Sequence, residues 1–295
     1  MNTSATTPAD NPDDASVPRV AIPSKGRLRE QTLDLLKHAG YSIGKLKGNN
    51  ASALSQGIQF IEMRPRDAAA WLSTGRLAAA FISTDTALES NVEDLPTIEL
   101  GYSRSDLVVA CRQDDPRSSV AELAGGTVAT HLPEWTRRWF AGQGIDVEVV
   151  PMGGALEGVC AVGVADAIVD LRETGGSLAR NHLRVLHEVQ GCQATFAHVA
   201  DPGAEIADLT LRITAALAAR ERQYVMLHIP ADKVDELSTV FPGLASPTVL
   251  PLAGRDDLVA AHMVVLSKNL WAKLGELRAM GASGIVALPT DAILA

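Results

Sequence analysis

The sequence predicts an α/β protein with two lobes like those of periplasmic binding proteins, a central cleft between them, and a C-terminal ferredoxin-like (β-α-β-β-α-β) domain for regulation or assembly. Three observations lead to this prediction. With about 150 residues as the usual size of a domain, the 295 residues argue for two or three compact units rather than one. Short apolar strands alternate with helical patterns up to about Ile206. Beyond that residue the order of strands and helices changes.

Composition and charge narrow the class of protein. Apolar residues at 46% and charged residues at 21% are typical of a folded chain. The net charge of −9 argues against a duplex nucleic acid partner. Three cysteines, Cys111, Cys160 and Cys192, show no zinc-ligand spacing and suit a reducing cytosol. No apolar run approaches the about 20 residues of a membrane span, so we expect a cytoplasmic protein without a membrane partner.

The first 206 residues contain the expected lobes. Residues 1–16 are polar and are expected to form a disordered tail. A strand at Val20–Ile22 precedes a helical pattern from Leu28 to Ala39, which Gly40 ends. Further strands are expected at Ile58–Met63, Leu77–Ser83, Val128–Thr130, Val147–Val150 and Ala167–Leu171. Alternation of this kind predicts layers of parallel strands and helices.

Two strands are expected where the chain crosses between lobes. Ile98–Leu100 and Leu107–Ala110 are separated by the turn-forming residues Gly101–Arg104. We therefore assign residues 17–104 and 182–206 to the first lobe and residues 105–181 to the second.

Residues 207–295 are expected to form the third domain. Its elements are predicted as a strand (Tyr224–Ile229), a helix (Ala231–Phe241), two strands (Thr248–Pro251 and Val259–Leu266), a helix (Leu270–Met280) and a strand (Gly284–Leu288). This order is that of the split β-α-β unit, which closes its own sheet.

The most informative stretch for chemistry runs from Glu157 to Leu178. An apolar strand ends at Asp170, and the turn Thr174-Gly175-Gly176-Ser177 then opens a helix. Backbone N–H groups and hydroxyls at such a turn can bind a phosphate, and Asp170 is placed to accept hydrogen bonds from sugar hydroxyls. A plain capped helix after a strand explains the same residues equally well.

The stretch resembles the phosphoribosyl-diphosphate loop of the long-form ATP phosphoribosyltransferases, the first enzymes of histidine biosynthesis. Glu157, Gly163–Ala165, Asp170 and Thr174–Leu178 match the family pattern, with Ser177 where the family has Thr. Four further segments follow in the family's order: Arg19–Leu28, Arg64–Asp67, Thr136–Phe140 and Pro242–Thr248. The resemblance extends from about residue 18 to the C-terminus.

The resemblance implies that the chain joins N1 of ATP to C1 of phosphoribosyl diphosphate and releases pyrophosphate with Mg²⁺ assistance. The catalytic residues that it implies are Asp170, Glu157, Lys25 and Arg27. The substrate-binding residues that it implies are Asp166, Glu173, Thr174, Gly175, Gly176, Ser177, Leu178, Arg64, Asp85 and Arg104. It implies no particular metal ligands.

Several of these residues also have simpler explanations. Lys25-Gly26-Arg27 on its own suits a solvated turn, and Arg104 can be a loop charge. His131, His182 and His187 are scattered without metal-ligand spacing, so we interpret them as surface or hydrogen-bonded imidazoles.

The chain departs from the family in two places. Ala78–Asp85 lacks an acid, two glycines and a threonine of the family pattern, and Asp106 replaces a cation beside the cleft. Lost hydroxyls and an added carboxylate would weaken triphosphate binding. Two alternatives therefore remain: a divergent phosphoribosyltransferase with another nitrogen acceptor, or a non-catalytic two-lobed ligand-binding protein. The near-complete phosphate loop argues against the second.

The same resemblance implies that the third domain regulates the enzyme. In the long-form family it binds histidine between subunits, which also implies a homo-oligomer, a dimer or hexamer. Ser246 and Thr248 match the histidine-binding motif, but His228 stands where Asn or Asp is usual. Because an imidazolium would repel the α-amino group of histidine, we expect feedback inhibition to be weak or absent.

Overall fold

The computed structural model describes residues 17–47, 51–242 and 246–294. The expected tail at residues 1–16 and part of the segment Pro242–Thr248 lie outside these ranges. The chain divides into two compact units, of which the second consists of Asp34–Ser42 and the residues from Asp208 onward. Within the described residues no helix is long and apolar enough to cross a bilayer.

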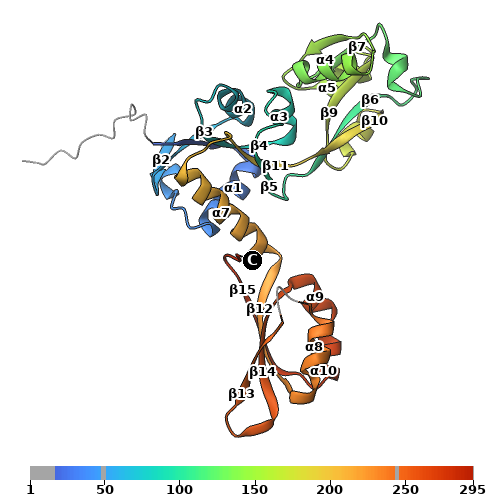
Figure 1. Cartoon of the computed structure of the whole chain (residues 1–295). Coiled ribbons are helices and arrows are strands. Elements are labelled where there is room, and N and C mark those ends of the chain that lie inside the picture. Colours follow the sequence, from blue (N-terminus) through green and yellow to red (C-terminus); the bar gives the residue numbers. More distant parts are fainter. Residues whose placement is uncertain (1–16, 48–50, 243–245, 295) are drawn as a thin grey trace, which may run out of the picture. The chain divides into compact units, whose positions relative to one another are not determined.

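The first lobe is built on a six-stranded mixed sheet (Figure 1). Its strands, in spatial order, are β2 (Ser52–Ser55), β3 (Ile58–Met63), β1 (Arg19–Pro23), β4 (Ala79–Ser83), β11 (Ala194–His198) and β5 (Thr97–Glu99). The central strand β1 runs parallel to β3 and β4, whereas the outer pairs are antiparallel. The helical elements of this part of the chain are α1 (Gly26–His38), η1 (Gly44–Lys47), α2 (Pro65–Ser73) and α3 (Thr84–Glu89). Helix α7 (Ala204–Arg220) leads into the second unit.

The second lobe has a five-stranded sheet of its own. Its strands, in spatial order, are β10 (Leu183–Cys192), β6 (Ser105–Arg112), β9 (Ala167–Arg172), β7 (Thr127–Thr130) and β8 (Glu148–Pro151). Its helical elements are η2 (Val120–Leu123), α4 (Pro133–Gly142), α5 (Leu156–Ala161) and α6 (Gly176–Arg180). The strands on either side of Gly101–Arg104, β5 and β6, lie in different sheets, which is what a crossing between lobes requires.

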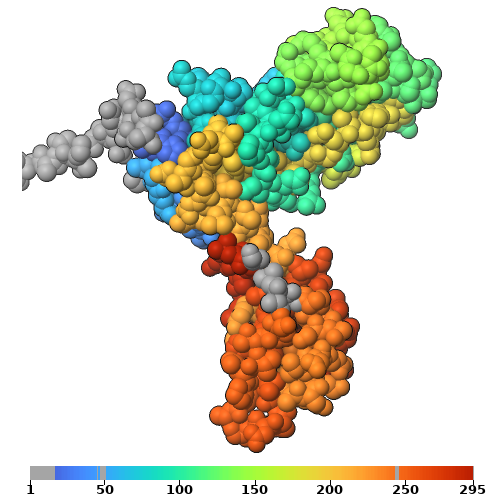
Figure 2. All heavy atoms as spheres, viewed as in Figure 1, coloured from blue at the N-terminus to red at the C-terminus, as the bar shows by residue number. Residues whose placement is uncertain are grey.

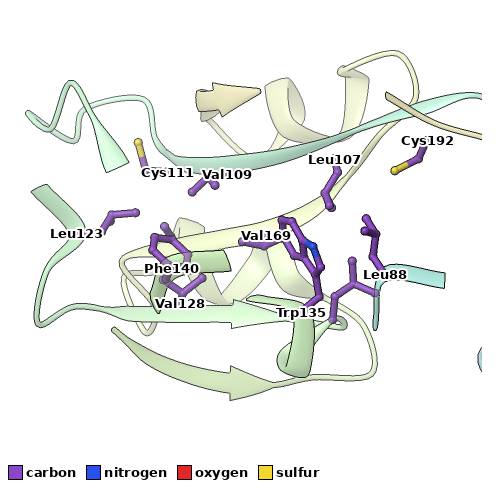
Figure 3. Packing of buried hydrophobic residues seen from close by; sticks show 12 residues of the cluster. Leu88, Leu107, Val109, Cys111, Leu123, Val128, Trp135, Phe140, Val169 and Cys192 are labelled. Carbon is purple, nitrogen blue, oxygen red and sulfur yellow. The ribbon is translucent and has the colours of Figure 1, made fainter. Parts of the chain in front are cut away.

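The core of the second lobe also receives a residue from the first. Trp135 and Phe140 of α4 point toward Val128 and Val169 of the sheet (Figure 3). Leu88, near the end of α3, packs in the same cluster. Burial of these side chains favours contact between α3 and α4 by the hydrophobic effect.

Two sequence expectations about the lobes are wrong. Residues 182–206 were assigned to the first lobe, but of this range only β11 lies in the first sheet, whereas β10 pairs antiparallel with β6 in the sheet of the second lobe. The layers are not purely parallel either, since β6 and β11 are antiparallel to their neighbours. Both differences come from strand pairs that are distant in sequence, such as Leu183 with Arg112.

The C-terminal domain has the predicted ferredoxin-like order. Its strands are β12 (Arg222–Pro230), β13 (Thr248–Leu252), β14 (Arg255–Leu266) and β15 (Ser283–Pro289), in the spatial order β13-β14-β12-β15. Its helices are η3 (Ala231–Lys233), α8 (Val234–Val240), α9 (Ser267–Ala272) and α10 (Leu274–Ala279). The single helix expected at Leu270–Met280 is therefore divided at Lys273.

Alternation along the strands fills the core of this domain. Val225, Leu227 and Ile229 of β12 are buried in one cluster with Leu237 and Leu277 from the helices. The intervening side chains lie on the other face of the sheet, as the period of two in a strand requires. The atoms of this domain, coloured orange to red in Figure 2, form a closely packed body.

Candidate active site

The candidate site begins where β7 ends beside β9. The two strands are parallel, with Thr130 opposite Val169, and the Thr130 hydroxyl donates to the Val169 carbonyl oxygen at 2.9 Å. The next residues along the two strands are His131 and Asp170. Because parallel strands present their carboxyl ends at one edge, these side chains meet there. His131 Nδ1 lies 3.4 Å from Asp170 Oδ1.

The Asp170 carboxylate lies in a largely buried, acidic environment. Its side chain is only 20% exposed, and Oδ1 accepts a hydrogen bond from the Leu171 amide at 2.8 Å. Burial raises the pKa of Asp170 above its ordinary value, while the Leu171 amide and His131 act in the opposite direction. The nearby Glu157 and Asp85 carboxylates raise the pKa further.

The loop after β9 surrounds a pocket of about 230 Å³. The pocket is lined by Glu157, Leu171, Arg172, Glu173, Thr174, Gly175, Gly176, Ser177, Leu178 and Arg180. Gly175 has φ +75°, a conformation that L side chains rarely adopt. Leu178 is 7% exposed and packs in the core with Val108 and Ile168, so it anchors the start of α6. The expected loop residues therefore come together around one pocket.

Ser177 is engaged by Glu157 across this pocket. Its hydroxyl donates to Glu157 Oε1, and this hydrogen bond is the main reason that the pKa of Glu157 is lowered. The prediction that the Ser177 hydroxyl contacts a phosphate stays a prediction, because here the hydroxyl proton is directed at a carboxylate.

Two arginines that the sequence interpretation did not select line the pocket. Arg172 is held by Asp106 at 2.8 Å and Glu188 at 2.7 Å. Arg180 forms no ion pair with a carboxylate of the described residues, and its Nη1 lies 3.4 Å from where a Cβ on Gly176 would be. Arg180 thus supplies the pocket with an available positive charge. The sequence signal that could have identified Arg180 was its position four residues after Gly176, one helical turn further along and on the same side of the helix.

Of the cationic side chains that were expected to bind substrate from the first lobe, one contacts the loop after β9. Arg27 reaches the loop, since its Nη2 donates to Glu173 Oε1 at 3.0 Å, with both side chains more than half exposed. Lys25, Arg64 and Arg104 are exposed, and no hydrogen bond or ion pair found among the described residues joins their side chains to the pocket. Their assignment to substrate stays a prediction.

Asp85 lies in the first turn of α3 and is only 5% exposed. Its Oδ1 has no hydrogen-bond partner among the described residues. Since its charge also acts on Asp170, the structure brings this expected site residue to the same region.

Three expectations need correction. Asp166 precedes β9 at the end opposite the loop, where it accepts hydrogen bonds from the Thr127 amide and Arg117, both at 2.9 Å. These bonds explain its lowered pKa, with the Thr127 amide contributing most, and they give it a structural role. Asp106 does not present an unpaired charge, since it forms an ion pair with Arg172, which Glu188 shares.

The third correction concerns the divergent stretch Ala78–Asp85, which was expected to alter contacts with a ligand. Ala79 to Ile82 of β4 are 0% exposed, in the middle of the first sheet. Their changes therefore alter packing rather than a ligand-facing surface. Only the strand end, from Ser83 to Asp85, approaches the site.

The expected effector residues lie on the C-terminal sheet. His228 is exposed on β12, and its Nδ1 is 3.3 Å from where a Cβ on Gly284 would be. Thr248 on β13 faces His262 on β14, one strand away from β12. Ser246 is exposed just before β13.

Two family models match the chain. The model described as ATP phosphoribosyltransferase matches residues 64–218. The model described as HisG, C-terminal domain, matches residues 219–292. Their junction falls within two residues of the end of α7.

Curated relatives match nearly end to end. A protein named ATP phosphoribosyltransferase from Methanococcoides burtonii is 33% identical over 285 residues, which cover 94% of this chain and 99% of that protein. Proteins of the same name from Gemmatimonas aurantiaca and Halobacterium salinarum are 35% and 36% identical, each covering 91% of this chain and 96% of the relative.

A solved structure shares the fold of part of the chain. The ATP phosphoribosyl transferase (HisG:HisZ) complex from Thermotoga maritima aligns with a TM-score of 0.57 at 24% identity. The alignment covers 67% of this chain and 96% of that one.

Proposed function

The chain belongs to the ATP phosphoribosyltransferase family, and we propose that the pocket after β9 is where it binds the phosphoribosyl group. It transfers this group from phosphoribosyl diphosphate to N1 of ATP, the first step of histidine biosynthesis. The observation that carries our assignment is the glycine-containing loop, which lines one pocket directly after β9, the strand that carries Asp170. A different nitrogen acceptor is not favoured, because the divergent strand β4 is buried.

The reaction breaks the bond between C1 of the ribose and the diphosphate oxygen. The bonding electrons leave with pyrophosphate, and N1 of the adenine uses its lone pair to form the new bond to C1. Asp170 would accept hydrogen bonds from the ribose hydroxyls and so hold C1 in line with the nucleophile. Thr174 and the loop amides would bind the 5-phosphate, and Arg27 would leave Glu173 for a substrate phosphate.

Mg²⁺ would enter with the substrate rather than occupy a protein site. No three His, Cys, Asp or Glu side chains of the described residues converge as a metal site. Magnesium is commonly held by substrate phosphates with one or two carboxylates, so the residues fit a metal carried by the diphosphate. When bound there, it would stabilise the charge that develops on the departing pyrophosphate.

Replacement of Arg180 tests the assignment of the pocket. We expect Arg180→Ala to raise the KM for phosphoribosyl diphosphate by about tenfold, because a charge-assisted hydrogen bond to phosphate contributes about 1.5 to 3 kcal/mol and the guanidinium is exposed. The KM for ATP should change little. Steady-state kinetics with each substrate varied in turn measures both values.

Arg278 provides the control. It lies in the last turn of α10 in the C-terminal domain, so Arg278→Ala should leave both KM values unchanged. An Arg180→Ala enzyme with an unchanged KM for phosphoribosyl diphosphate, or with equal changes for both substrates, would remove this pocket as the 5-phosphate site.

We also propose that the chain forms a homo-oligomer. The face of the C-terminal sheet opposite its helices carries the half-exposed side chains Leu250, Val286 and Leu288. An antiparallel sheet with an uncovered apolar face gains stability when that face is buried against another surface.

Histidine is the effector that we propose for the C-terminal domain, acting weakly. His228 is exposed on β12, where its imidazole would oppose an α-amino group when protonated. We expect initial rates to fall little at sub-millimolar histidine and to fall clearly in His228→Asn. Strong inhibition of the unmodified enzyme in that range would show that residue 228 does not weaken effector binding.

A further inference from the structure

We propose that His131 is a positioning residue for Asp170, keeping its carboxylate ionised and oriented toward the ribose hydroxyls. This inference rests on the proposed function, since it assigns a partner to a residue of that site. It also changes the interpretation of His131, which the sequence alone presents as one of several scattered histidines.

The backbone fixes His131 beside Asp170. Thr130 is paired in register with Val169, and its hydroxyl donates to the Val169 carbonyl oxygen. The same hydroxyl oxygen accepts a hydrogen bond from the Leu132 amide at 3.0 Å. Thr130 is fully buried, so both bonds are shielded from water. The residue between Thr130 and Leu132 is therefore held at the end of β7 next to Asp170.

The charges around Asp170 explain why His131 would matter for its ionisation. Two carboxylates act on the charge of Asp170, Glu157 from α5 and Asp85 from α3, and Asp85 is nearly fully buried. Burial and both acids favour protonation of Asp170. His131 is the side chain that acts in the opposite direction among the main influences on Asp170, and its ring is 30% exposed beside a carboxylate that is 20% exposed. A protonated Asp170 would lose the charge that strengthens hydrogen bonds from the ribose.

The pairing of His131 with Asp170 predicts that loss of His131 weakens the use of phosphoribosyl diphosphate. Removal of His131 should raise the pKa of Asp170, so a larger fraction of the enzyme would carry the neutral acid as the pH falls. The KM for phosphoribosyl diphosphate should rise by about three- to tenfold near neutral pH, and kcat/KM should fall at a higher pH than in the unmodified enzyme. The KM for ATP should stay nearly constant.

The experiment compares pH profiles of kcat/KM for phosphoribosyl diphosphate in the full chain and its variants. In His131→Ala, the acidic limb of the profile should move to higher pH. His131→Gln retains an N–H donor and should restore part of the loss. His38→Gln is the matched control, because His38 forms another histidine and aspartate pair, with Asp34 at 3.6 Å, within helix α1.

A double-mutant cycle with Asp170→Asn completes the test, with phosphoribosyl diphosphate binding measured by calorimetry. If His131 acts through Asp170, His131→Ala should have no effect on binding in the Asp170→Asn background. An equal effect in both backgrounds, or an unmoved acidic limb, would overturn the inference. If Asp170→Asn itself leaves turnover unchanged, the proposed function of the loop is wrong. Failure of the proposed function is thereby distinguished from failure of the inference about His131.

Discussion

Asp170→Asn is expected to reduce kcat/KM for phosphoribosyl diphosphate by about 10²- to 10⁴-fold while the fold remains intact. Two charge-assisted hydrogen bonds to ribose hydroxyls, at about 1.5 to 3 kcal/mol each, would lose their charge and part of their geometry. Asn has nearly the same volume and can still accept the Leu171 amide, which Asp170 binds at 2.8 Å. Steady-state kinetics gives the loss, and circular dichroism with thermal unfolding verifies the fold.

Asp201→Asn is a suitable control for this variant. Asp201 is an exposed aspartate between β11 and α7, so the same chemical change there should leave kcat/KM unaltered. Turnover of Asp170→Asn within a few-fold of the unmodified enzyme would exclude Asp170 from ribose binding.

Glu89→Ala is expected to destabilise the first unit by about 2 to 4 kcal/mol. The Glu89 side chain is 4% exposed and accepts hydrogen bonds from Arg66 at 3.0 Å and from the amides of Glu134 and Trp135. Those two amides belong to the first turn of α4, where a carboxylate also stabilises the positive end of the helix dipole. Alanine would leave the amides without this partner.

The consequence of Glu89→Ala extends to the site, because Glu89 links α3, whose first turn contains Asp85, to α4, which follows His131. Thermal unfolding followed by calorimetry should show a midpoint lower by about 4 to 16 °C for the transition of this unit. Glu93→Ala removes an exposed glutamate four residues further along and should shift the midpoint little. Equal midpoints for the two variants would contradict the proposed link.

The elements that depend on local signals were predicted from the sequence. The β-α-β-β-α-β domain is an example, because the alternation in β12 and the turn before β15 are each encoded within a few residues. The loop that we propose to bind phosphate was identified for the same reason, since Thr174 to Ser177 follow their strand with only Glu173 between. Such features need no knowledge of distant contacts.

Features that depend on register and distant pairing were not predictable. His131 and Asp170 are 39 positions apart and meet only because β7 and β9 pair with Thr130 opposite Val169. Asp166 fits the loop pattern in sequence but lies at the opposite end of β9. The burial of Ala79 to Ile82 depends on β4 lying between β1 and β11, and their side chains alone do not reveal it.

The most direct test of the account is the identity of the product. The full chain should be incubated with phosphoribosyl diphosphate, ATP and Mg²⁺, and the products analysed by mass spectrometry with a parallel pyrophosphate assay. The account predicts phosphoribosyl-ATP with the ribose on N1 and one pyrophosphate released for each adduct. Consumption of phosphoribosyl diphosphate without this adduct, or transfer only to another nitrogen nucleophile from a panel tested beside ATP, would contradict it.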